Sequence, residues 1–177
     1  MMRYAGIIKN DIAAAPGVCL SFFTQGCPFH CKNCHNPETW DFDGGKEFTY
    51  ETLQEIENGL FANGIPRTFC IMGGEPLCES NSFLVELIIK ELKKKYPDLK
   101  IWIWTGYTFE QLLARKNSRI LDILSNITGI VDGPYIDELR DISLPMRGSS
   151  NQRIIDLTLQ KNYDKIKKIK KELLNER

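Results

Sequence analysis

The most informative stretch of the chain reads Gly26-Cys27-Pro28-Phe29-His30-Cys31-Lys32-Asn33-Cys34-His35-Asn36. It places three cysteines within eight residues, in the spacing C-x3-C-x2-C. Thiolates are soft ligands that select iron–sulfur clusters, zinc or copper(I). Three thiolates on one short loop can bind three irons of a cubane, and the fourth iron then stays open. The spacing therefore favours a catalytic [4Fe–4S] cluster on Cys27, Cys31 and Cys34, because a ferredoxin would use a fourth cysteine here.

A structural zinc site is the alternative that this motif leaves open, with His30 or His35 as a further ligand. Zinc ribbons usually contain two C-x2-C pairs, and the sequence has no second pair. Cys70 and Cys78 are eight residues apart, which is a poor spacing for a zinc knuckle. With a structural zinc site, the chain would be an interaction module that catalyses no reaction.

Composition limits the class of protein. The 177 residues are 42% hydrophobic, which suits one globular domain with a core. No segment approaches the roughly 20 apolar residues of a membrane helix, and residues 1–6 lack a secretory signal. The formal net charge is zero, so nothing global indicates nucleic acid or a membrane as partner. Without a secretory signal, six cysteines indicate a reduced, cytoplasmic protein rather than a disulfide framework.

Predicted strands and helices alternate along the chain. Periodicity and turn residues predict strands at 18–24, 68–72, 100–105, 129–132 and 153–157, and helices at 49–62, 82–96, 109–115, 119–125 and from 159 onward. Such alternation indicates an α/β fold with a parallel sheet. The chain is shorter than the ~250 residues of a complete eight-unit barrel, so we expect a partial, open parallel β/α barrel of five or six units.

The expected domain covers residues 1–158, and residues 159–177 form a basic C-terminal helix or tail. Between Lys161 and Arg177 the chain carries six lysines and one arginine against three acidic residues. Such a run is most often a solvated helix face, and docking on an acidic partner is the alternative.

A second motif, Met72-Gly73-Gly74-Glu75-Pro76, follows the predicted strand at 68–72. Paired glycines let a backbone approach a ligand closely, and Glu75 adds a carboxylate suited to an ammonium group. Together with the cysteines about forty residues upstream, this motif resembles the Gly-Gly-Glu-Pro motif of the radical S-adenosylmethionine (SAM) superfamily. The resemblance covers nearly the whole chain and implies a fold of the radical SAM type.

Within that superfamily the chain resembles the activating proteins of anaerobic ribonucleoside-triphosphate reductases. The most specific part is the block from Arg147 to Arg153, which no general α/β argument requires. The matching pieces are Pro16-Gly17, residues 26–36, Thr39-Trp40, residues 103–107, residues 131–135 and residues 147–153.

The resemblance implies a reaction and its partners. The reduced [4Fe–4S] cluster would cleave SAM into methionine and a 5′-deoxyadenosyl radical, which takes a hydrogen atom from a glycine of the reductase. The partners would be the glycyl-radical subunit of the reductase and an electron donor of the flavodoxin or ferredoxin type. Activation of another glycyl-radical enzyme, or radical chemistry on a small molecule, is the alternative within enzymes.

The resemblance also implies the residues that contact SAM, while no side chain is assigned as catalytic. Many members of the superfamily carry an aromatic residue just before the third cysteine, where this chain has Asn33. We therefore expect the backbone of Asn33, Cys34 and His35 to hold the adenine. The methionine part would be held by Gly73, Gly74 and Glu75. Thr105 and Asp132, at the ends of later strands, are possible ribose or partner contacts, with ordinary turn roles as the alternative.

Overall fold

The computed structural model describes residues 2–175. Its strands are β1 (Arg3–Asp11), β2 (Cys19–Thr24), β3 (Lys46–Glu47), β4 (Thr68–Gly73), β5 (Ile101–Trp104), β6 (Gly129–Asp132) and β7 (Arg153–Asp156). Its α-helices are α1 (Tyr50–Leu60), α2 (Glu79–Lys95), α3 (Phe109–Ala114), α4 (Ser118–Ser125) and α5 (Gln160–Asn175). Short 3-10 helices lie at Pro37–Thr39, Ala62–Gly64 and Asp137–Leu139.

The strands form one mixed sheet in the order β3-β1-β2-β4-β5-β6-β7. The central strands β2, β4, β5 and β6 are parallel to one another, which confirms the α/β fold with a largely parallel, open sheet. The described sheet thus has four parallel strands, fewer than the five or six parallel units that we expected. Strands β1, β3 and β7 are antiparallel to their neighbours.

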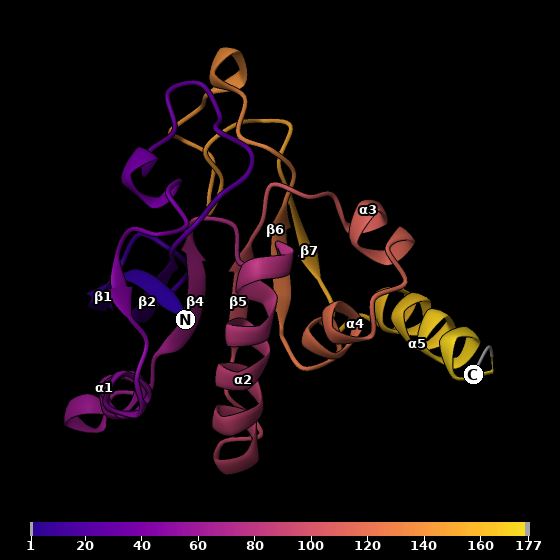
Figure 1. The fold of residues 1–177 in the computed structure, drawn as a ribbon, viewed down its shortest axis with the longest axis horizontal. Coiled ribbons are helices and arrows are strands. Elements are labelled where there is room, and N and C mark those ends of the chain that lie inside the picture. Colours follow the sequence, from indigo (N-terminus) through magenta and orange to yellow (C-terminus); the bar gives the residue numbers. More distant parts are fainter. Residues whose placement is uncertain (1, 176–177) are drawn as a thin grey trace.

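The difference at β7 has a topological cause. A strand parallel to β6 would need a crossover that returns the chain to the other end of the sheet. Residues 133–152 instead form a loop that stays at the carboxyl end of β6, so the chain re-enters the sheet in the opposite direction (Figure 1). We call this segment the 133–152 loop.

Local sequence signals explain where several helices begin. Thr49 caps α1 in a capping box with Thr52, and Thr108 caps α3 in the same way with Gln111. The side chain of Asn117 caps α4. Helix α2 ends in three lysines, whose charges favour the negative end of the helix dipole.

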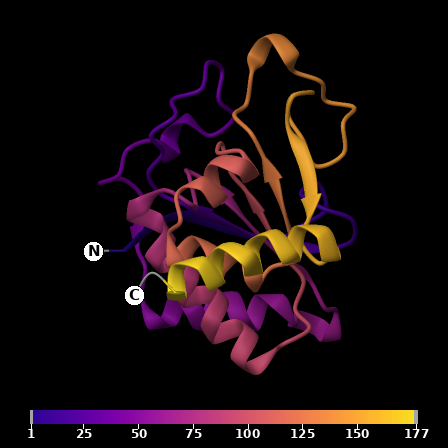
Figure 2. The ribbon, with the colours of Figure 1, turned by 90° about the vertical axis from the view of Figure 1, so that its right-hand side faces the viewer.

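The helices lie together against one face of the sheet (Figures 1 and 2). Buried side chains of β2, β4 and β5, such as Phe22, Phe69 and Ile103, pack there against helix residues that include Ile56 and Ile88. A smaller apolar group on β2 and β4 contains Cys19 and Cys70, both fully buried as expected of small hydrophobic residues. Among the described helices, none is long and apolar enough to span a bilayer.

Candidate functional site

The cysteine loop, which we define as residues 26–36, leaves the sheet directly after β2. It lies at the carboxyl end of the parallel strands, where ligands collect in open α/β sheets. Main-chain hydrogen bonds fix its start, from Gly26 N to Thr39 O at 2.8 Å and from Cys27 N to Trp40 O at 3.1 Å. The loop then reverses at His30 and Asn33, which have positive φ angles of 47° and 53°. A cysteine follows each reversal, so this backbone sets the direction of Cys31 and Cys34.

The three thiols of the loop are half-buried and electrostatically coupled. Burial raises the pKa of Cys27 to about 11, and the negative charges of Glu75 and Cys31 add to that increase. Burial also raises the pKa of Cys31, with Cys34 as the next cause. Cys31 thus affects Cys27, Cys34 affects Cys31, and Glu75 affects both Cys27 and Cys31. The structure brings together the two motifs that lie forty residues apart in the sequence.

The donor set fits an iron–sulfur cluster. A mononuclear zinc site needs three or four ligand atoms that converge on one point. Within residues 2–175, no three His, Cys, Asp or Glu side chains are arranged to hold one metal ion in this way. A cubane makes a different demand, because each cysteine binds a separate iron. Three free, partly buried thiols on one loop match that demand, and the zinc alternative gains no support from this geometry.

The two glycines after β4 let the chain pass close to the cysteine loop. Gly73 has a φ angle of 99°, and a side chain on Gly74 would collide with the carbonyl oxygen of Gly26. Gly74 N donates to Thr24 O at 2.9 Å, and Glu75 N donates to Gly26 O at 2.8 Å. Packing of the two loops therefore accounts for the close backbone approach that we had expected toward a ligand.

The side chain of Asn81, in the first turn of α2, supports the same contact. Its Nδ2 donates to Gly26 O at 3.0 Å and to Glu75 O at 2.9 Å. Asn81 could not be found from the sequence, because an asparagine inside a helical pattern carries no local sign of a contact 55 residues away.

The carboxylate of Glu75 connects the loop after β4 with the loop after β5. It is 1% exposed and accepts hydrogen bonds from Thr105 Oγ1 at 2.7 Å, Gly106 N at 2.7 Å and Leu77 N at 2.9 Å. Burial raises the pKa of Glu75 to about 7, although these donors and the charge of Arg115 act in the opposite direction. Glu75 and Thr105, which we had expected at the site, are therefore direct partners.

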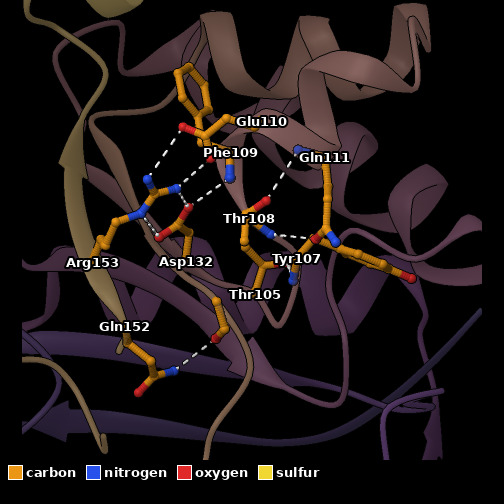
Figure 3. A network of polar contacts seen from close by, with 10 residues as sticks. Thr105, Tyr107, Thr108, Phe109, Glu110, Gln111, Asp132, Gln152 and Arg153 are labelled. Atoms are coloured by element: carbon orange, nitrogen blue, oxygen red, sulfur yellow. Dashed lines mark hydrogen bonds and ion pairs between the residues drawn. The ribbon is translucent and has the colours of Figure 1, made fainter. Parts of the chain in front are cut away.

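The side chain of Asp132 has a different environment, shown in Figure 3. Its Oδ1 accepts from Arg153 Nε at 2.9 Å, and its Oδ2 accepts from Arg153 Nη2 and from Phe109 N. Arg153 also pairs with Glu110 at 2.6 Å (Figure 3). These partners come from β7 and from the start of α3. The geometry thus gives Asp132 a structural role, and the ribose or partner contact that we had considered for it stays a prediction.

The 133–152 loop lies beside the cysteine loop at the carboxyl edge (Figure 1). Lys32 Nζ pairs with Glu138 at 2.7 Å, and Asn33 Nδ2 donates to Asp137 Oδ2 at 2.7 Å. Sequence reasoning missed both acidic residues, since these contacts span more than a hundred residues. His35 is exposed, and the exposed His30 packs its ring on Trp40 at 4.8 Å.

Two hollows of the structure lie away from this site. One, of about 560 Å³, is lined by Lys93, Thr128 and Tyr163, among other residues. The other, of about 550 Å³, is lined by Arg67, Thr68, Tyr96 and their neighbours. Thr68 is the first residue of β4 and Thr128 directly precedes β6, so these hollows lie at the opposite edge of the sheet from the cysteines.

Comparison with known proteins gives a consistent picture. Residues 13–155 match the model of a family described as a 4Fe-4S single cluster domain. The chain is 34% identical to the anaerobic ribonucleoside-triphosphate reductase-activating protein of Vibrio cholerae over 159 residues, which are 89% of this chain and all of that protein. It is 33% identical to the proteins of the same name from Escherichia coli K12 and Enterobacteria phage T4. These alignments cover 85% and 86% of this chain, and 96% and 93% of the two relatives.

Proposed function

The chain belongs to the family of anaerobic ribonucleoside-triphosphate reductase-activating proteins, and from this premise we propose that it activates an anaerobic ribonucleotide reductase. It does so by radical SAM chemistry at a [4Fe–4S] cluster. The observation that carries this proposal is the 33–34% identity to such activating proteins over 85–89% of the chain. The family match over residues 13–155 includes both the cysteine loop and the Gly73–Glu75 turn. The packing of these two segments against each other supports it.

Cys27, Cys31 and Cys34 would hold the cluster as ligands of three irons, which leaves the fourth iron for SAM. When bound, these cofactors supply a one-electron cleavage whose radical product removes a hydrogen atom from a glycine of the reductase. The thiols must lose their protons to bind iron. Their partial burial, which raises the pKa of Cys27 and Cys31, means that iron binding has to drive this proton loss.

The Gly73–Glu75 turn would bind the methionine part of SAM. An ionised carboxylate offers about four acceptor sites, and Thr105, Leu77 and Gly106 occupy three of those on Glu75. One site is left for an ammonium group. Thr105 would then act by orienting Glu75, and the fixed carboxylate would discriminate in favour of a cationic amine.

The adenine would contact the backbone of Asn33, Cys34 and His35. Asn33 turns its side chain to Asp137, so its main chain is the part that remains to interact with a nucleoside. Asp132 would act as a positioning residue, because its carboxylate holds Arg153 and the first turn of α3.

We further propose that the open sheet is a partial β/α barrel of the radical SAM type. Helices on one face leave the other face of the sheet free to curve around the site. The partner would be the glycyl-radical subunit of the reductase, with a flavodoxin- or ferredoxin-type electron donor. The six free thiols and a cluster that must be reduced suit the cytoplasm as the compartment.

Electron paramagnetic resonance of anaerobically reconstituted, reduced protein tests this function. We expect a cubane signal that shifts when SAM is added, formation of 5′-deoxyadenosine, and a glycyl radical on added reductase. One zinc per chain, with no iron signal and no response to SAM, would show that the cysteines are structural. A normal cluster response with no radical on the reductase would instead indicate a different protein substrate.

A further inference from the structure

Three consecutive residues of the cysteine loop contact one segment of the 133–152 loop. The main chain of Tyr135 lies near the Cys31 thiol. Lys32 pairs with Glu138, and Asn33 donates to Asp137 Oδ2, both at 2.7 Å. These contacts fall on the turn between the second and third cysteines, so they act on the part of the loop that orients two cluster ligands.

The backbone conformation of Asn33 links its hydrogen bond with Asp137 to the position of Cys34. Asn33 has a φ angle of 53°, in the left-handed region that asparagine tolerates better than most residues. Cys34 N donates to Cys31 O at 3.1 Å, which closes the turn. A side-chain hydrogen bond that holds Asn33 therefore holds the backbone that carries both Cys31 and Cys34.

Hydrogen bonds within the 133–152 loop support Asp137 on the other side of this contact. Asp137 Oδ1 accepts a hydrogen bond from Tyr135 Oη at 3.0 Å, which leaves Oδ2 for Asn33. At the base of the 133–152 loop, Asn151 Nδ2 donates to Pro134 O at 2.7 Å and Gln152 Nε2 donates to Gly133 O at 3.1 Å. Asp137 thus belongs to a loop whose two ends are joined by hydrogen bonds.

We propose that Asp137 is a positioning residue for the cluster ligands, acting through Asn33 on the turn that carries Cys31 and Cys34. This inference rests on the proposed function in one respect, namely that these cysteines bind the cluster. The neighbouring Lys32–Glu138 pair has a smaller role, because exposed ion pairs contribute little and Lys32 lacks the positive φ angle of Asn33.

Iron release from the anaerobically reconstituted protein to a ferrous chelator tests the proposal. We expect Asp137→Ala and Asn33→Ala each to speed release by a similar factor of about two to five, because each removes the side-chain hydrogen bond between these two residues. The double variant should show the same factor, because both substitutions remove the same contact. Asp137→Asn should stay near wild type, since its amide oxygen can still accept from Asn33.

The electron paramagnetic resonance signal with SAM supplies a second readout. The alanine variants should give a broadened signal, whereas Asp137→Asn should keep the wild-type line shape. Glu138→Gln and Asp141→Asn are matched controls on the same loop, and Asp141 bonds to Ser143 rather than to the cysteine loop. Both should behave as wild type. Urea unfolding of the iron-free variants should show unchanged midpoints.

If the wild-type protein binds its cluster, two results would overturn the role of Asp137 and leave the proposed function intact. One is wild-type iron release by Asp137→Ala, and the other is a double variant whose effect is the product of the single effects. Wild-type protein that takes up no iron under the same conditions would overturn the proposed function, and this inference with it.

Discussion

At the scale of single residues, the surroundings of the cysteines separate ligands from packing residues. Cys27, Cys31 and Cys34 are partly exposed on one loop, whereas Cys19 and Cys70 are fully buried on neighbouring strands. Cys31→Ala should abolish both cluster assembly and SAM cleavage, because it removes one of three iron ligands. Cys70→Ala should retain both. Iron and sulfide analysis together with assay of 5′-deoxyadenosine measures the outcome.

Cys70→Ala is a demanding control, since it removes a buried sulfur atom and should cost on the order of 1 kcal/mol of stability. Loss of the cluster in the Cys31 variant therefore cannot be ascribed to destabilisation if the Cys70 variant keeps its cluster. A Cys31→Ala protein that assembles a full cluster and cleaves SAM would contradict the ligand assignment.

Glu75 predicts a pH dependence of stability in the iron-free protein. Its pKa is raised from 4.5 to about 7 in the folded state, chiefly by burial. The folded state therefore binds a proton more tightly than the unfolded state does. The contribution of Glu75 to stability is complete below pH 4.5 and is lost as the pH rises toward 7, by up to about 3 kcal/mol. Urea unfolding of the wild type across this range measures the loss.

Glu75→Gln removes the titrating group and should flatten this pH dependence. It should also lower the free energy of unfolding at pH 5 by about 1–3 kcal/mol, because its amide cannot accept from all three donors. Glu79→Gln, on the exposed first turn of α2, is the matched control and should keep the wild-type slope. An equal slope in wild type and Glu75→Gln would show that another group is responsible.

At the scale of secondary-structure elements, the sequence predicted what is locally encoded. The helices expected at 49–62 and 82–96 correspond to α1 and α2, because apolar periodicity marks both and the cap Thr49 marks the start of α1. Strand β1 was missed, since it is an outer strand whose side chains are mostly half-buried or exposed and show no clear alternation. The antiparallel direction of β7 could not be predicted from the local sequence pattern either, because it depends on the path of the 133–152 loop.

The same distinction holds for the site. The cysteines and the Gly-Gly-Glu turn were found from the sequence because each is a compact motif with its own chemistry. Asn81 and Asp137 were missed because their roles come from partners 55 and 104 residues away. The pairing of Asp132 with Arg153 combines two residues that we had considered separately.

That pairing predicts a large effect of Arg153 on stability. Asp132 is buried, with a side-chain exposure of 1%, and Arg153 is its only charged partner within residues 2–175. Arg153→Ala would leave a buried carboxylate with the single donor Phe109 N, and should lower the free energy of unfolding by about 3–5 kcal/mol. Chemical denaturation of the iron-free protein measures this change.

Glu110→Gln is the matched control for the same arginine. The Glu110 side chain is 64% exposed, and exposed ion pairs contribute at most about 1 kcal/mol. A loss in Arg153→Ala no larger than in Glu110→Gln would show that Asp132 is satisfied without its arginine, and would remove the basis for its positioning role.

At the scale of the whole molecule, the loops of the candidate site and the lysine-rich helix α5 lie on different parts of the structure. The cysteine loop, the Gly73–Glu75 turn and the 133–152 loop gather at the carboxyl end of the parallel strands. Helix α5 packs on α4, on the helix-covered side of the sheet (Figures 1 and 2). Its many lysines therefore lie on the outer surface of the helix layer rather than around the site.

The packing of α5 predicts that it is part of the domain rather than a dispensable tail. Ile166 is 1% exposed and belongs to the main core, and Lys170 pairs with Asp122 of α4 at 2.7 Å. Ile166→Ala should lower the free energy of unfolding by about 2–5 kcal/mol. Lys167→Ala, one residue further on the exposed face, should change it by less than about 0.5 kcal/mol. A small loss in the Ile166 variant would instead favour a domain that ends at residue 158, because a tail that contributes little to the core can lose an isoleucine at little cost.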